Sequence, residues 1–262
     1  MPTKRPASAE FQSQDAEPKK HKATAPANET NGKGIHEPTQ NGRDLQDGDV
    51  TSFFSKSKRL FDGPERQEMT STYSSSTPYL LLLPSTDHSY RHIIIPDLMD
   101  EKLLSDVRSE ILTHLHFTPK QTDIYSVSQT GDLANLSGLD SSELDSLPSL
   151  LKLRNALYSK TFRDFLCAVT GVKALSGTKT DMSINKYEKG GHLLTHDDVI
   201  GTRSVSYILY LVEDGWKEEW GGGLRLYKTS EEGVPDNEPS LTIPPKWNQM
   251  AMFGNNYSPA EC

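Results

Sequence analysis

The distribution of hydrophobic residues divides the chain into a polar arm and a patterned remainder. Residues 1–50 are rich in Lys, Glu, Gln, Asn, Asp and Pro, and every aromatic residue except Phe11 follows them. Such a segment cannot bury enough apolar surface to offset the conformational entropy that folding costs. We therefore expect a disordered arm over residues 1–50, a transitional segment over 51–78 and a folded domain over 79–253.

Within the transitional segment, two aromatic or aliphatic pairs interrupt the polar pattern. Phe53-Phe54 and Leu60-Phe61 could dock on the domain as a short helix. The Ser/Thr-rich stretch over residues 70–77 is expected to be loose.

The domain opens with a pattern typical of a strand followed by a helix. Residues 92–96 form an apolar run closed by proline, which indicates a buried strand. Asp97 or Asp100 then offers an N-cap, and leucines, valine and isoleucine recur at helical spacing. The pattern predicts a helix that ends near His116.

A second helical region follows an extended piece over residues 124–127. Pro148 is suited to the first position of a helix because its missing N–H would have no partner there. The apolar stripe continues to Val169, and Gly171 stops it as a C-terminal cap.

After Gly171 the pattern changes to short strands separated by turn residues. These strands are expected within residues 182–187, 204–211, 223–227, 241–243 and 249–253. Helices that precede strands predict an α+β fold in which helices support an antiparallel sheet.

Composition excludes several classes of protein. Lys plus Arg is 28 and Asp plus Glu is 36, a net charge of −8, so direct DNA binding is not expected. No apolar run approaches the roughly 20 residues that span a bilayer, so no membrane partner is expected. Cys167 and Cys262 give no disulfide framework and no zinc spacing.

Two basic clusters in the arm, residues 4–5 and 19–22, fit a nuclear import signal, with a solvated charge cluster as the alternative.

Candidate chemistry lies in residues 187–198. On a strand, residues two apart point to the same side, so His196 and Asp198 could aim an imidazole and a carboxylate at one point. They would supply two of the three ligands of the two-histidine, one-carboxylate iron site. Two alternatives stay open: a surface histidine beside acids, and a zinc hydrolase that uses His192 and His196.

A tyrosine in the next strand strengthens this hypothesis. Tyr210 lies in a strongly apolar run, where its phenol could donate a hydrogen bond to a carboxylate inside a barrel. The alternative is a buried tyrosine bonded to backbone.

Several separate blocks carry a resemblance to a known family, in family order and with family spacing. Over about residues 50–253 the chain resembles the 2-oxoglutarate- and Fe(II)-dependent prolyl hydroxylases that modify a ribosomal protein, in particular their fungal 3,4-dihydroxylase branch associated with translation termination. The blocks are residues 129–136, 147–154, 179–185, 193–200, 203–211 and 221–226.

The resemblance implies a double-stranded β-helix, or jelly roll, with flanking helices. It implies that His196 and Asp198 bind Fe(II), that Tyr187 and Tyr210 contact the co-substrate 2-oxoglutarate, and that L-ascorbate is a further cofactor. The implied substrate is a prolyl residue of a small-subunit ribosomal protein. Translation-termination factors are implied as further partners, and the nucleus and cytoplasm as the location.

The chain departs from the family toward its C-terminus. The family has a third iron-ligating histidine and a basic residue for the distal carboxylate of 2-oxoglutarate, but no His follows His196 and no Arg follows Arg225. The last lysine, Lys246, precedes the expected place, and residues 254–262 look unrelated. We therefore expect a C-terminally truncated, incomplete jelly roll with impaired activity. The alternative function is a non-catalytic interaction protein that retains the scaffold.

Overall fold

The computed structural model describes residues 50–55, 60–61, 63–75, 91–133, 141–196, 203–213, 215–228, 230 and 234–254. The expected disordered arm, apart from Val50, and the expected tail, apart from Gly254, lie outside the described residues, and so does Asp198. The helices are η1 (Thr51–Phe53), α3 (Pro64–Ser75), α4 (Glu101–His114), α5 (Ser141–Asp145), α6 (Pro148–Tyr158), α7 (Lys160–Thr170) and η3 (Glu218–Trp220). The strands are β1 (His92–Ile95), β2 (Thr118–Gln121), β3 (Tyr125–Gln129), β4 (Asn185–Lys186), β5 (His192–Leu193), β6 (Val205–Leu209), β7 (Leu224–Leu226), β8 (Leu241–Ile243) and β9 (Met250–Gly254).

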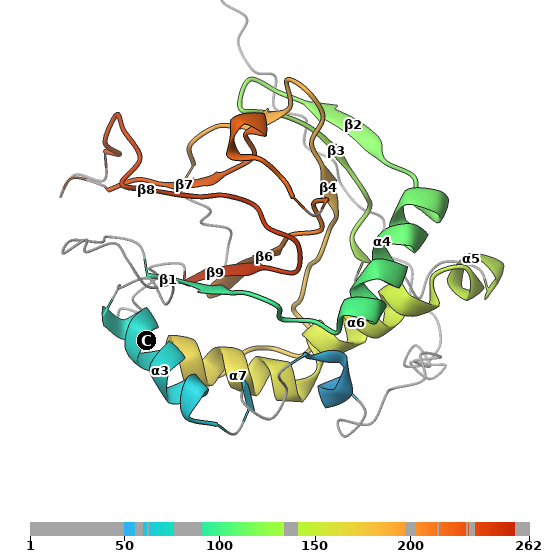
Figure 1. The fold of residues 1–262 in the computed structure, drawn as a ribbon, viewed down its shortest axis with the longest axis horizontal. Helices are drawn as coiled ribbons and strands as arrows, with labels where there is room; N and C mark the ends of the chain where they lie inside the picture. The colour runs from blue at the N-terminus through green and yellow to red at the C-terminus, as the bar shows by residue number, and fades with distance from the viewer. Residues whose placement is uncertain are drawn as a thin grey trace, which may run out of the picture. The chain divides into compact units, whose positions relative to one another are not determined.

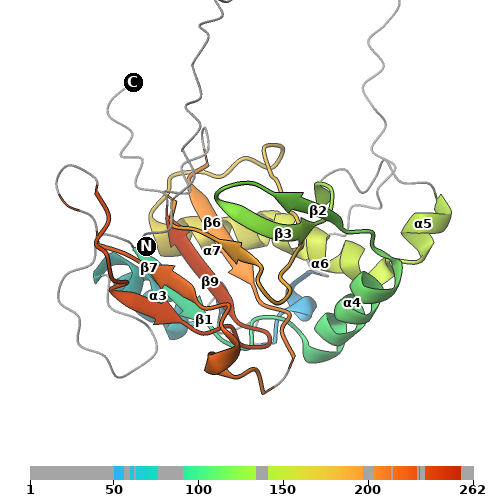
Figure 2. The same ribbon diagram turned by 90° about the horizontal axis from the view of Figure 1, so that it is seen from above.

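The central sheet has the order β1-β9-β6 and is antiparallel throughout (Figure 2). Every residue of β9 is buried, since the strand is paired on both edges and covered on both faces. The side chains of β9 alternate between the two faces of the sheet. Met250 and Met252 therefore pack on one face and Ala251 on the other. The strands predicted at residues 92–96, 204–211 and 249–253 are confirmed.

One face of this sheet is covered by helices, and we call the apolar cluster there the helix-side core. Figure 1 shows α3 and α7 on this side of β1 and β9. On α7, buried residues recur at helical spacing: Phe162, Phe165, Leu166 and Val169. The ring of Phe162 stacks on Phe54 at 5.5 Å between centroids. This contact joins residues before the expected domain start to the core.

The opposite face of the sheet, which we call the inner face, packs against the β7–β8 hairpin (Figure 1). Ile94 and Ala251 from the central sheet meet Leu226 and Ile243 from the hairpin, and all four are buried. We call this group the inner cluster. The hairpin strands predicted within residues 223–227 and 241–243 are confirmed.

A second antiparallel sheet is built around β3. Strand β2 pairs with one edge of β3, while β4 and β5 pair in succession along the other edge. Both β4 and β5 have two residues, so the strand predicted over residues 182–187 is shorter than expected.

The helix starts are set by local side chains. Asp100 caps α4, because its carboxylate accepts from the N–H of Leu103 at 2.9 Å. Asp97, the other expected cap, instead turns the chain with a φ of 50°. The expected C-cap at Gly171 is confirmed by its left-handed φ of 78°.

Two expectations are wrong. The stripe from Pro148 to Val169 is two helices rather than one, because Ser159 adopts an extended conformation and its hydroxyl caps α7 by accepting from Phe162. The stretch expected to be loose is helical in α3 as far as Ser75, and its Tyr73 is buried in the helix-side core.

The helices and antiparallel sheets confirm the α+β class. The described strands form three separate antiparallel sheets and do not close into a barrel. Among the described residues, no helix combines the length and apolar character needed to cross a membrane.

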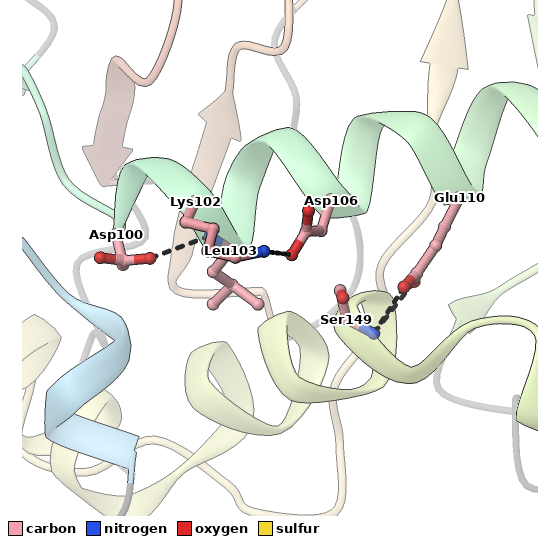
Figure 3. A network of polar contacts seen from close by, with 6 residues as sticks. All are labelled: Asp100, Lys102, Leu103, Asp106, Glu110 and Ser149. Atoms are coloured by element: carbon pink, nitrogen blue, oxygen red, sulfur yellow. Dashed lines mark hydrogen bonds and ion pairs between the residues drawn. The ribbon is translucent and has the colours of Figure 1, made fainter.

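The start of α6 depends on a side chain from another helix. Its N-cap residue, Leu147, provides no side-chain acceptor. Glu110 of α4 accepts instead from the N–H of Ser149 at 2.9 Å and of Leu150 at 2.8 Å (Figure 3). A carboxylate at a helix N-terminus satisfies free N–H groups and complements the helix dipole.

We expect Glu110→Ala to lower the free energy of unfolding by about 1–2 kcal/mol, because two N–H groups of α6 lose a charged acceptor. Urea denaturation followed by circular dichroism measures this change. Asp106→Ala is the matched control on the same helix, since it removes only an exposed pair with Lys102 and should change stability by less than about 0.5 kcal/mol. Equal effects of the two variants would contradict the capping role.

Candidate active site

Of the candidate site residues, Tyr210 lies on the inner face of the central sheet. On β6, Val205, Tyr207 and Leu209 pack against the helix-side core, so the chain presents Tyr210 to the opposite face. Tyr210 accordingly packs against the inner cluster.

The position of Tyr210 is fixed by its backbone. Its N–H donates to the carbonyl of Gln249 at 2.9 Å, and its carbonyl accepts from the N–H of Asn248 at 3.1 Å. Asn248 is 2 % exposed, and its side chain bonds both backbone groups of Met99, accepting at 2.9 Å and donating at 2.8 Å. Tyr210 is thus tied to the start of β9 and, through Asn248, to the turn after β1.

The phenols of Tyr187 and Tyr210 interact electrostatically. Burial and, to a smaller extent, the phenol of Tyr187 together raise the pKa of Tyr210 to about 12. Burial also raises the pKa of Tyr187. Both phenols are therefore protonated at neutral pH, when each is able to donate a hydrogen bond to an anion.

Tyr187 follows β4 at the start of a bulge. Lys186 pairs with Ser128 and His192 pairs with Ser126, so residues 187–191 lie opposite the single residue Val127. The N–H of Gly191 closes the bulge by donating to the carbonyl of Glu188 at 2.7 Å. Only glycine fits there, because a Cβ on Gly191 would lie 2.9 Å from the Glu188 oxygen.

His196 lies beyond the end of β5 and is exposed. Its Nδ1 is 2.8 Å from the carbonyl oxygen of Leu194. A carbonyl can only accept, so Nδ1 carries the proton and Nε2 presents its lone pair. Metal-ligating histidines commonly have this arrangement, so the imidazole fits a metal ligand. The structure therefore describes one residue of the expected pair, His196, while Asp198 lies outside the described residues.

The zinc alternative gains no third ligand in the described part of the chain. His192 is exposed in β5, and its Nδ1 is 3.1 Å from the carbonyl oxygen of Gly190. Across the described residues, no group of three His, Cys, Asp or Glu side chains is arranged to hold a metal ion.

The structure adds polar residues that the sequence did not single out for a role. The amide nitrogen of Gln129 donates to Asn185 Oδ1 at 2.8 Å and to Ser183 Oγ at 3.0 Å, and its oxygen accepts from Lys120. Asn185 is 56 residues from Gln129, so no local pattern joins them. Alternation along β3 and β4 could have predicted the face on which each side chain lies, but not that Gln129 and Asn185 are in contact.

Comparison with known proteins agrees with the geometry of this region. Residues 182–260 match the model of the 2OG-Fe(II) oxygenase superfamily. The chain is 42% identical to "Prolyl 3,4-dihydroxylase OGFOD1" of Ostreococcus tauri, over 63% of this chain and 32% of that protein. It is 32% identical to "Prolyl 3-hydroxylase OGFOD1" of Mus musculus, over 72% of this chain and 32% of that protein. It is 28% identical to "Prolyl 3-hydroxylase sudestada1" of Drosophila melanogaster, over 61% of this chain and 28% of that protein. The matched region is thus about a third of the length of these curated relatives.

We expect Tyr187→Phe to lower the pKa of Tyr210 from about 12 part of the way toward 10, since one source of repulsion on the tyrosinate is removed while burial remains. Carbon NMR of ring-labelled tyrosine measures the titration, and Tyr227→Phe is the control. A raised native pKa means that the native state holds its proton longer. The free energy of unfolding should therefore fall as the pH rises from about 10 to about 12, and fall less in Tyr187→Phe. An unchanged Tyr210 titration would contradict the contact.

We expect Asn248→Ala to cost about 1–3 kcal/mol of stability, because the buried N–H of Met99 loses its partner and its carbonyl, which also accepts from the Ser55 hydroxyl, loses one of two donors. Chemical denaturation measures the loss. Lys246→Ala, an exposed change two residues away, should stay within about 0.5 kcal/mol of wild type. A cost below that of an ordinary surface substitution would show that Asn248 does not anchor this region.

Proposed function

We propose that the chain acts in the hydroxylation of a prolyl residue, since its residues 182–260 match the 2OG-Fe(II) oxygenase superfamily and its curated relatives are prolyl hydroxylases. One observation carries the proposal. The segment that matches the family contains two phenols that are protonated at neutral pH, Tyr187 and Tyr210, and a histidine, His196, whose Nδ1 lies 2.8 Å from the carbonyl oxygen of Leu194, which assigns Nε2 as the nitrogen suited to a metal.

His196 and Asp198 would hold Fe(II). Two protein ligands bind a divalent ion more weakly than the three of a complete facial triad, so we expect weak metal affinity in this chain. When bound, Fe(II) supplies the activation of O₂ that hydroxylation of a prolyl carbon requires, with 2-oxoglutarate as the co-substrate and L-ascorbate as the reductant that preserves Fe(II).

Tyr187 and Tyr210 would contact 2-oxoglutarate. A neutral phenol donates to a carboxylate without bringing charge of its own, and its raised pKa keeps it in the donating form. Packing of Tyr210 against the inner cluster would orient the co-substrate by holding one donor rigidly.

The expected architecture around this site is a jelly roll. Its support is the packing of the β7–β8 hairpin on the inner face of the central sheet, with helices on the other face. In this arrangement the reacting groups would lie between two sheets, away from the helices.

The proposed substrate is a prolyl residue of a small-subunit ribosomal protein. The names of the relatives support prolyl hydroxylation, and the resemblance described above supports the ribosomal substrate, an association with translation-termination factors and a location in nucleus and cytoplasm. The basic clusters at residues 4–5 and 19–22 are the sequence feature that supports nuclear import.

A non-catalytic interaction protein is the second candidate. It would keep the dioxygenase scaffold without turning over 2-oxoglutarate. Metal binding and turnover of 2-oxoglutarate separate the two functions.

The decisive experiment supplies Fe(II), 2-oxoglutarate, ascorbate and purified small ribosomal subunits to the full chain. We expect slow succinate formation together with the addition of oxygen to a prolyl residue, measured by mass spectrometry. His196→Ala and Asp198→Asn should each reduce this activity to background, because each removes one of the two proposed ligands. Asp197→Asn is the matched control and should retain it.

Two results would contradict the enzymatic proposal. One is oxidation of proline that persists without 2-oxoglutarate or in His196→Ala. The other is the absence of turnover and of Mn(II) binding in the wild-type chain, which would favour the interaction protein.

A further inference from the structure

The bulge beside Tyr187 removes the usual restraint on its position. A residue inside a regular ladder is held by backbone hydrogen bonds to its neighbour strand, but residues 187–191 share the single partner Val127. Tyr187 is 46% exposed, so packing alone holds it weakly. Some other contact must fix where β4 ends and the bulge begins.

The residue before β4, Ile184, is held by two hydrogen bonds to Thr130. The N–H of Thr130 donates to the carbonyl of Ile184 at 3.1 Å, and the Thr130 hydroxyl accepts from the N–H of Ile184 at 3.0 Å. Asn185 then pairs with Gln129 and Lys186 with Ser128 before the ladder is interrupted.

A side-chain bridge reinforces the strand at the step before the bulge. The side-chain amide nitrogen of Gln129 donates to Oδ1 of Asn185, in β4, at 2.8 Å. It also donates to Oγ of Ser183, which precedes β4, at 3.0 Å. Its oxygen is held by Lys120 of β2. The bridge therefore joins three of the four strands of this sheet, β2, β3 and β4.

The bridge lies on the side of β4 that is turned away from the helices. Met182 and Ile184 pack against the helix-side core, so Ser183 and Asn185 point away from it. Tyr187 follows two residues beyond Asn185, and Tyr210 also lies away from the helix-side core, where it packs against the inner cluster.

From this geometry we propose that Gln129 is a positioning residue. Through Asn185 it fixes the second-to-last residue pair of the β3–β4 ladder, and so sets where the chain leaves the ladder and where the phenol of Tyr187 lies. The significance of that position rests on the proposed function, in which Tyr187 contacts 2-oxoglutarate. The position itself is a property of the ligand-free protein and is tested without the co-substrate.

The test uses fluorine NMR of the full chain labelled with ring-fluorinated tyrosine, with the two signals assigned from Tyr187→Phe and Tyr210→Phe. In Gln129→Met, which preserves side-chain size, we expect the Tyr187 signal to move toward the value of free fluorotyrosine. Asn185→Leu should reproduce this change, while the melting temperature stays close to that of wild type.

Two further variants separate positioning from a general structural effect. Asn185→Asp retains the oxygen that accepts from Gln129 and should restore the wild-type Tyr187 signal. Ser128→Ala changes the neighbouring residue on β3, whose side chain points to the other face, and should leave the signal unchanged. The proposal is overturned if Gln129→Met and Asn185→Leu leave the Tyr187 signal in place, or if Ser128→Ala displaces it equally.

Adding 2-oxoglutarate to the wild-type chain distinguishes this inference from the proposed function. If neither tyrosine signal responds to 2-oxoglutarate, the proposed role of the phenols fails. The comparison among the ligand-free variants still decides whether Gln129 positions Tyr187.

Discussion

The buried carboxamide of Asn248 is the constraint on which the remaining structure depends. Its backbone bonds Tyr210 at the end of β6 and Leu98 after β1, while its side chain bonds both backbone groups of Met99. Its φ of 56° is one that asparagine tolerates better than most residues. These bonds fix where β9 begins relative to β1 and β6, and this starting point sets the register of the central sheet.

Register has a chemical consequence because the side-chain period of a strand is two. A slip of one residue in β9 would exchange Met250 and Met252 with Ala251 and Phe253, placing large side chains on the wrong face. The same slip in β6 would turn Tyr207 away from Phe162, on which its ring packs at 5.9 Å. The burial of the helix-side core thus specifies that Tyr210 belongs to the inner face.

The sequence was informative where the chemistry is local. Apolar periodicity predicted α4 and β9. Pro148 marked the start of α6 and Gly171 the end of α7, since each residue acts through its own backbone. Ser159 was misread because its capping role interrupts an apolar stripe that is otherwise continuous. The helical state of α3 was missed because its sequence is polar and rich in Ser and Thr, and it is stabilised instead by burying Met69 and Tyr73 in the helix-side core.

The candidate site shows the same division between local and distant contacts. Tyr210 could be predicted to lie in an apolar strand, and His196 could be named from its spacing to Asp198. The interaction of Tyr187 with Tyr210 could be suggested only through family resemblance, because it depends on a bulge and on pairing between distant segments. The contact from Gln129 to Asn185 could not be predicted, since it requires the register of β3 with β4.

Electrostatics explains why phenols suit this site. The chain carries a net charge of −8, so a dianion such as 2-oxoglutarate approaches a protein of its own sign. A carboxyl group of ordinary pKa has already lost its donor proton at acidic pH, whereas a buried phenol stays neutral and donating far above pH 7. Neutral donors add no repulsion, and they need no counter-charge when the anion is absent. A pair of phenols held by Asn248 on one side and by the Gln129 bridge on the other can therefore remain ordered in the empty protein, so that less ordering has to accompany the binding of the anion.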